Sequence, residues 1–373
     1  MMATITKSTG KEPLFHIVRR TDMPMWKSWL IRILSVLASL IVCAVIIVLV
    51  TGDNPIQIYA TMFKGSFGSP RRFWALLQGI AMLLCVSLAL TPAFKMRFWN
   101  IGGEGQVLMG GLGATACMIL FGNKLPAPVV LLLVIVVSIL CGAIWGLIPA
   151  VFKAFWNTNE TLFTLMMNYI AIQIVSYFTY IWSSNKGNNV INTINNDTHA
   201  GWLELPSSVD KYGYMLNVLI VAALTIMMYF YLKYSKQGYE ISVVGESENT
   251  AKYAGINVKK VIIRTMIISG ALCGVAGMLL VSGTDHTINP DTAGGRGFTA
   301  IMVSWLAKFN PLFMVVTSLL IVFMQKGAIE ISTQFGLNSS FSDIITGIII
   351  FFIIGSEFFI NYKIQKRAKE VEA

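Results

Sequence analysis

The feature that most constrains this chain is a succession of apolar runs, separated from one another by short polar segments. A helix needs about 20 apolar residues to cross the hydrocarbon core of a bilayer, because each residue advances it by about 1.5 Å. Charged residues make up 12% of the 373 residues, whereas a soluble domain usually has about 25%. The chain is therefore predicted to be an all-α integral membrane protein.

The membrane domain is expected to cover residues 29–360, with about ten transmembrane helices. One of them, Phe298–Ala307, is too short for an ordinary span and is expected to be a half-length or tilted helix. Ile56–Phe67 is expected to form a short surface helix. The expected spans are 29–50, 73–94, 107–121, 129–152, 161–182, 213–232, 261–282, 298–307, 312–329 and 343–359.

Basic residues predict the orientation of the spans, because cytoplasmic segments carry an excess of Lys and Arg. Residues 1–28 and the tail 361–373 are both rich in such residues, so both termini are expected in the cytoplasm. Segment 233–261 then lies inside and the loop 183–212 outside. The net charge of +10 is spread over short segments beside apolar runs, which is typical of a membrane protein in contact with lipid and argues against a nucleic acid partner.

The most polar stretch between the apolar halves is Tyr234–Arg264. Within it, Glu246–Ala254 has neither Pro nor Gly and begins with acidic residues, which favours a short helix ended by Gly255. A helix of about nine residues is marginal alone in water, so its membrane ends or a partner protein should hold it. The stretch is interpreted as a docking element; a solvated loop between two spans is the alternative.

Two glycine-rich turns are similar and are expected to face opposite sides of the membrane. Each opens into an apolar helix, and an odd number of spans between equivalent positions would invert the second copy. Paired Gly-interrupted segments of this kind indicate an inverted-topology repeat with broken or half helices, as found along transporter pathways. Chance similarity is the alternative reading. The turn residues are Gly102, Gly103 and Gly105 in the first copy, and Gly294, Gly295 and Gly297 in the second.

Five residues are candidates for the substrate pathway. Glu104 lies between glycines at the bilayer edge, where a buried carboxylate is costly, so it either faces the pathway or caps the third span. Asn168, like Gln173 on the same span, either contacts a polar substrate or joins two helices by a hydrogen bond. Phe298, Ser304 and Trp305 lie on the short eighth segment, where aromatic rings stack on a flat ligand or simply mark the membrane interface.

No set of residues in the sequence has the pattern of a catalytic site, a metal site or a cofactor site. The three histidines are scattered, the five cysteines lack metal spacing, and no phosphate-binding glycine loop with Lys-Ser/Thr is present. The chain is therefore not expected to be an enzyme. No intramembrane chain of acidic, Arg or His residues suggests a proton relay, so an energy source in another subunit is favoured over a stand-alone secondary transporter or channel.

Three motifs resemble those of a known family: Asn100–Gln106, Asn159–Ala171, and Gly245–Val258 followed by Ile268–Gly277. Together they are similar to the permease subunits of bacterial ATP-binding cassette (ABC) importers, and within these to nucleoside-type permeases, relatives of the branched-chain amino acid and ribose permeases. The resemblance extends from about Leu76 to Ile360. Asn159 departs from the family pattern, which leaves the substrate more open than the subunit type.

The resemblance implies import of nucleosides across the bacterial cytoplasmic membrane by alternating access, with ATP hydrolysis by partner subunits. Sugars, branched-chain amino acids and flavin-like vitamins remain alternative substrates. The implied partners are a second homologous permease, a cytoplasmic ATPase and an extracellular substrate-binding lipoprotein. The resemblance also implies a coupling helix that fits a cleft on the ATPase, formed by Glu246, Ser247, Glu248, Ala251, Tyr253, Ala254 and Gly255.

Overall fold

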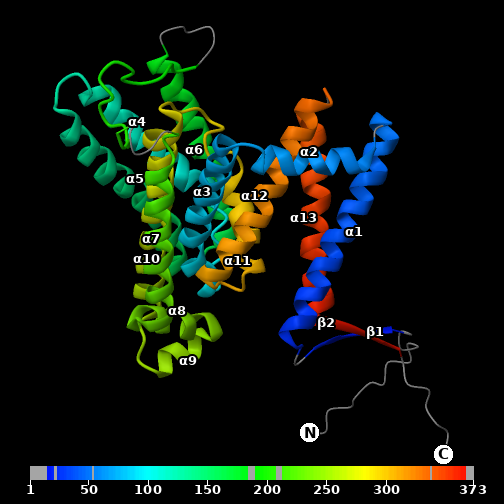
Figure 1. Ribbon diagram of the computed structural model, residues 1–373. Coiled ribbons are helices and arrows are strands. Elements are labelled where there is room, and N and C mark those ends of the chain that lie inside the picture. The colour runs from blue at the N-terminus through cyan, green and yellow to red at the C-terminus, as the bar shows by residue number, and fades with distance from the viewer. Residues whose placement is uncertain are drawn as a thin grey trace, which may run out of the picture. The chain divides into compact units, whose positions relative to one another are not determined.

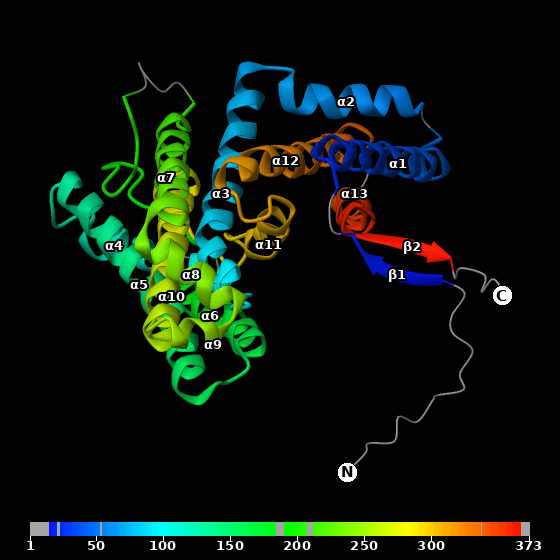
Figure 2. The same cartoon turned by 90° about the horizontal axis from the view of Figure 1, so that it is seen from below.

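A computed structural model describes residues 15–20, 23–52, 54–183, 190–206, 212–336 and 338–366, and its elements are drawn in Figures 1 and 2. Within these residues, nine helices are long and apolar enough to span a membrane. A further helix, α11 (Arg296–Leu306), has 11 residues and corresponds to the expected short segment. The prediction of an all-α membrane protein is confirmed.

The remaining helices follow the expected spans closely, with ends that differ by a few residues. The spanning helices are α1 (Met25–Thr51), α3 (Pro70–Lys95), α4 (Gly103–Phe121), α5 (Ala127–Trp156), α6 (Glu160–Trp182), α7 (Met215–Tyr234), α10 (Val258–Leu280), α12 (Pro311–Gln334) and α13 (Ser339–Asn361). The short ones are the expected α2 (Pro55–Phe67), then α8 (Lys236–Glu246), α9 (Glu248–Tyr253) and the π-helical turn η1 (Val281–Asp285) that continues α10.

The chain divides into two compact units, residues 1–59 with 331–373, and residues 60–330. In the first unit, α1 packs against α13 and an ion pair joins Arg32 to Glu357. The terminal segments of this unit also pair, because strand β1 (Phe15–Arg19) runs antiparallel to β2 (Tyr362–Lys366). These two strands were not predicted: each has only five residues, and their basic residues were interpreted only as orientation signals.

The second unit is built around α10, which contacts α3, α4 and α5. In the most apolar window of each helix, 78% of the residues of α10 and its continuation are buried, against 22% for α5. Helices α3 and α4 are buried like α10, each to 72%. Helices α3, α4 and α10 therefore form the core of this unit, whereas much of the surface of α5 is exposed on the surface of the unit. Figures 1 and 2 both show α3 between α7 and α12.

Glycines let α10 approach its neighbours at backbone distance. A Cβ atom at Gly274 would overlap the carbonyl oxygen of Ser138 on α5, and one at Gly270 would overlap that of Gly142. On the opposite side, a Cβ atom at Gly277 would overlap the carbonyl oxygen of Val107 on α4. Small residues permit such contacts between membrane helices, and they bring α10 close to both α4 and α5.

Two sequence-based boundaries are wrong. The third span begins at Gly103 and not at Val107, because neither Gly103 nor Gly105 adopts the positive φ of a turn and both continue the helix. The helix expected over Glu246–Ala254 is shorter, covering Glu248–Tyr253. Its start is moved by Ser247, whose hydroxyl accepts a hydrogen bond from the Thr250 amide and caps the helix. Gly255 does end it as expected, with a φ of +75°.

Part of the expected external loop, residues 190–206, lies against the end of α10, whereas 184–189 and 207–211 fall outside the described residues. The Trp202 ring stacks on His286 with 3.7 Å between centroids. The His199 Nδ1 atom lies 3.0 Å from a carboxylate oxygen of Glu204. A backbone hydrogen bond from Ile194 to His286 completes the contact. The described part of this loop is therefore packed on the protein.

Candidate functional site

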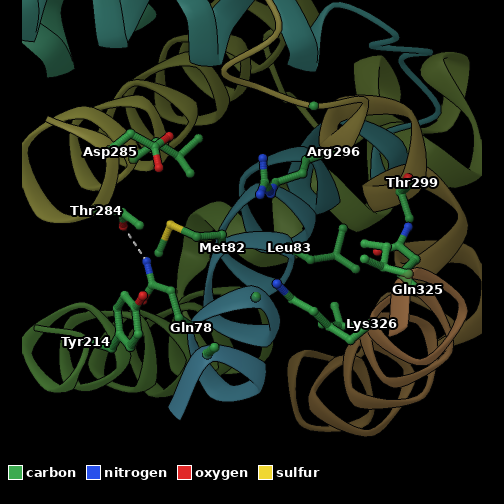
Figure 3. Close-up of a pocket in the computed structure, with 16 residues that line it drawn as sticks. Gln78, Met82, Leu83, Tyr214, Thr284, Asp285, Arg296, Thr299, Gln325 and Lys326 are labelled. Carbon is green, nitrogen blue, oxygen red and sulfur yellow. Dashed lines mark hydrogen bonds between the residues drawn. The ribbon is translucent and has the colours of Figure 1, made fainter. Parts of the chain in front are cut away.

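A polar cavity of about 300 Å³ opens between α3, α10, α11 and α12 of the second unit (Figure 3). Its volume lies at the lower end of the range of about 300–1,000 Å³ that small-molecule sites occupy. Three of its polar residues lie within α3 and α12, which are of spanning length: Gln78 on α3, and Gln325 and Lys326 on α12. The other polar lining residues are Tyr214, Thr284, Asp285, Arg296 and Thr299.

Three charged side chains of the described residues line this cavity without a direct ion pair between them. No ion pair or hydrogen bond engages the side chains of Asp285 or Lys326 anywhere in the described part of the chain. Arg296 donates from Nη1 to the carbonyl oxygens of Thr292 and Ala293, at 3.2 and 3.1 Å. Figure 3 shows Asp285, Arg296 and Lys326 around the same opening. Charges within a membrane domain are costly, so the absence of a hydrogen-bond or ion-pair partner for Asp285 and Lys326 among the described residues marks the cavity as a candidate ligand site.

A buried hydrogen-bond network fixes one wall of the cavity. The Thr284 hydroxyl donates to the Leu279 carbonyl oxygen and accepts from the side-chain amides of Gln78, at 2.6 Å, and Asn217, at 3.2 Å. Asn217 also donates to the Gly283 carbonyl oxygen. The hydroxyl proton is thereby committed to Leu279, which requires Gln78 to act as a donor here. The turn η1, which carries Asp285, is thus anchored to α3 and α7.

Next to the cavity, the two glycine-rich turns of the sequence touch each other. The Glu104 carboxylate accepts hydrogen bonds from the amides of Gly295, at 2.8 Å, and Gly297, at 2.7 Å. Glu104 therefore caps the N-terminus of α11, and not that of its own helix as the capping alternative assumed. A Cβ atom at Gly297 would overlap the Glu104 backbone nitrogen. The contact joins α4 to the helix that carries Arg296.

Asn168 anchors the first turn from the other side. Its Oδ1 atom accepts from the Gly105 amide at 2.8 Å, and its Nδ2 atom donates to the Ile101 carbonyl oxygen at 2.9 Å. The side chain is buried and is not among the described residues that line the cavity. These contacts join α6 to α4, which is the helix-joining alternative. Gln173 lies on the exposed surface of α6.

None of the three candidates on α11 is among the described residues that line the cavity. Ser304 is buried and donates to the carbonyl oxygens of Ser87 and Ala300. Trp305 is 46% exposed and stacks on Trp99 with 5.4 Å between ring centroids. The Phe298 ring is also exposed, at 44%. Their place on the substrate pathway stays a prediction, since the described cavity is lined by other residues.

The polar segment after α7 forms two helices that are fixed to the spans. A Cβ atom at Gly245 on α8 would overlap the Lys95 carbonyl oxygen at the end of α3. An ion pair of 2.9 Å joins Glu240 on α8 to Arg264 on α10. Beyond α8, the Tyr253 side chain on α9 is 93% exposed. The segment is thus rigidly linked to two cavity helices and presents its tip outward.

Sequence reasoning missed the cavity residues, although a signal was present. Lys326 is a charged residue inside an otherwise apolar span, and such residues are functional candidates by default. Asp285 and Arg296 were placed in an external loop, and the sequence gives no sign that this loop folds back to α3. The sequence predicted no intramembrane chain of acidic, Arg or His residues of the kind that a proton relay uses, and this stays a prediction; what the sequence did not indicate is that one acidic and two basic side chains line one cavity.

Known proteins resemble this chain over most of its length. Residues 71–354 match the family described as "branched-chain amino acid transport system / permease component". A guanosine ABC transporter permease of Bacillus subtilis is 29% identical, with 83% of this chain and 89% of that protein covered. A nucleoside ABC transporter permease of Lactococcus lactis is 28% identical (88% and 91% covered). A glucose ABC transporter permease of Haloferax volcanii is 27% identical (92% of both).

Proposed function

The chain belongs to the family of branched-chain amino acid transport system permease components, and on this premise we propose that it is the permease of an ATP-driven nucleoside importer. Two of the similar proteins are permeases for guanosine and for nucleosides. The observation that carries the proposal is the polar cavity inside the spanning helices of the second unit. A nucleoside is small, uncharged and rich in hydrogen-bonding groups, and the cavity offers both donors and acceptors.

The substrate enters the cavity from outside in this proposal. Gln78, Asp285 and Lys326 all lie near the ends of α3, η1 and α12 that the basic-residue pattern assigns to the external side. The same pattern assigns both termini to the cytoplasm. The pairing of β1 with β2 supports that assignment, because it requires both terminal segments to lie on the same side of the membrane.

The energy for transport comes from a cytoplasmic ATPase that binds α8 and α9. A displacement of this segment is transmitted to α3 through Gly245 and to α10 through the Glu240–Arg264 ion pair. Both helices carry cavity residues, so such a displacement changes the cavity between outward-facing and inward-facing forms. The other partners are a second homologous permease and an extracellular substrate-binding lipoprotein. The pathway role of Glu104, Asn168, Phe298, Ser304 and Trp305 is proposed to be indirect, through the position of α11.

Uptake of radiolabelled nucleosides tests the proposal, in cells without nucleoside transporters that express the chain with its genomic partners. Uptake should require the ATPase subunit. A double substitution, Ala254→Glu with Gly255→Glu, should abolish uptake, because glutamate is strained at the φ of +75° that Gly255 adopts. The protein should still insert, because the tip of α9 is exposed. Uptake that persists without the ATPase would favour a stand-alone carrier and refute the proposal.

Glucose is a second candidate substrate, because the similar glucose permease covers 92% of this chain. The same cells distinguish the two substrates when labelled glucose replaces the nucleoside. Glucose uptake that depends on the ATPase, without nucleoside uptake, would establish a sugar importer instead.

A further inference from the structure

Asp285 and the two basic residues occupy different walls of the cavity. Asp285 ends η1, whereas Arg296 belongs to α11 and Lys326 to α12. No ion pair links the carboxylate to either cation among the described residues. A carboxylate and a guanidinium that face one cavity attract each other strongly at low dielectric. Since both walls hold them apart, the space between them suits a ligand with hydrogen-bond donors at one end and acceptors at the other.

Each wall holds its charged group firmly. The Gln78–Thr284–Asn217 network anchors the residue next to Asp285. On the opposite wall, the Arg296 guanidinium is held by two carbonyl oxygens through Nη1 alone. Its remaining N–H groups have no protein partner in the described chain. Met82 from α3 lies between Asp285 and Arg296, and Leu83 lies beyond Arg296 toward Gln325 (Figure 3).

We propose that Asp285 binds the ribose of the substrate through the 2′- and 3′-hydroxyl groups, while Arg296 and Lys326 bind acceptor atoms of the base. The inference rests on the proposed nucleoside function. A carboxylate only accepts hydrogen bonds, and the vicinal hydroxyls are the donors that every ribonucleoside carries whatever its base. Acidic side chains bind ribose hydroxyls in this way in dinucleotide-binding proteins. The apolar lining between the walls contacts the faces of the base.

This assignment makes Asp285 a residue that distinguishes ribonucleosides from deoxynucleosides. A hydrogen bond to a charged group contributes about 1.5–3 kcal/mol, so each lost hydroxyl should weaken transport about tenfold or more. The external binding protein also selects among substrates. The informative quantity is therefore the change in selectivity when only this chain is altered.

The test compares inhibition of labelled uridine uptake by unlabelled uridine and by 2′-deoxyuridine, in cells that express the complete transporter. The ratio of the two half-inhibitory concentrations is measured for the wild type and for Asp285→Asn. We expect the deoxynucleoside to be about tenfold weaker in the wild type and the ratio to fall toward one in the variant. Asp285→Glu should keep part of the selectivity. Because the ratio uses one protein for both compounds, it does not depend on how much variant reaches the membrane.

Asp291→Asn is the matched control, because Asp291 is exposed on the same external segment and is not among the described cavity residues. Its ratio should equal that of the wild type. An Asp285→Asn ratio that stays at the wild-type value would overturn the ribose assignment and leave the nucleoside importer in place. If the wild-type transporter takes up glucose and no nucleoside, the proposed function fails, and the ribose assignment fails with it.

Discussion

The contact between Glu104 and the start of α11 allows a quantitative prediction for the variant Glu104→Gln. In the protein, both carboxylate oxygens accept an amide hydrogen, from Gly295 at 2.8 Å and from Gly297 at 2.7 Å. A glutamine of the same length keeps one acceptor and turns an NH₂ group toward the other amide. One backbone donor is then left unsatisfied, which costs about 1–3 kcal/mol. Loss of a negative charge at a helix N-terminus adds about 0.3–1 kcal/mol.

The sum, about 1.3–4 kcal/mol, should appear as local opening of the first turn of α11. Since about 1.36 kcal/mol corresponds to a factor of ten, amide hydrogen exchange in a peptide that contains Gly295 and Gly297 should accelerate by about tenfold to a thousandfold. The measurement is hydrogen exchange with mass spectrometry on the purified transporter in lipid nanodiscs. Glu104→Asp, whose carboxylate is one methylene closer to the backbone, should give an intermediate acceleration.

The control is Glu248→Gln, which removes an acid from the first turn of the exposed helix α9. Surface substitutions of this type usually change stability by less than about 0.5 kcal/mol, so exchange in α11 should stay at the wild-type rate. Unchanged exchange at Gly295 and Gly297 in Glu104→Gln would show that the carboxylate does not hold α11, and the argument from these contacts would be wrong.

Three further predictions concern packing, stacking and pH. Gly274→Ala should lower the melting temperature of the protein, because a Cβ atom there overlaps backbone. The control is Gly347→Ala, whose Cβ atom meets nothing within 4 Å and which should stabilise its helix by up to about 1 kcal/mol. Equal effects of the two substitutions would contradict the packing argument. A double-mutant cycle of Trp99→Ala and Trp305→Ala should give a coupling energy of about 0.5–1.5 kcal/mol in thermal unfolding, and additive losses would show that the stacked rings do not interact. Burial lowers the pKa of His286 below its ordinary value of 6.5, so the unfolded state binds the proton more readily and stability should fall as pH drops below 6.5. Melting curves of His286→Gln should show a weaker loss at low pH, and a steeper one would refute the assignment.

The sequence predicted the spans well, because apolar length is a local property that each segment shows by itself. It also predicted that Gly255 ends a helix, since that signal lies within a few residues of the chain. The sequence identified Glu104 as a candidate for the pathway or for a helix cap. Its partners Gly295 and Gly297 could not be predicted, because they lie far along the chain and no local pattern links them to Glu104. The cavity was missed for the same reason, because Asp285 comes to line it only when η1 folds against α3.

The contact between the two glycine-rich turns is a second feature that the sequence could not predict. Their similarity was noticed in the sequence and interpreted as an inverted repeat, which stays a prediction. That they touch is a property of the packing of α4 against α11, which three matching glycines do not encode.

The glycine contacts of α10 have a consequence for how much this chain can change. On the surface of α5 that faces away from the core, one apolar side chain can replace another with little effect on packing. At Gly270, Gly274 and Gly277 there is no room even for a methyl group, because the neighbouring backbone already occupies the space. Saturation mutagenesis should therefore find a narrow stripe along α10 where even alanine is not tolerated, in contrast to the exposed surface of α5. Positions that tolerate no substitution would then mark where the backbone of α10 contacts the backbones of its neighbouring helices.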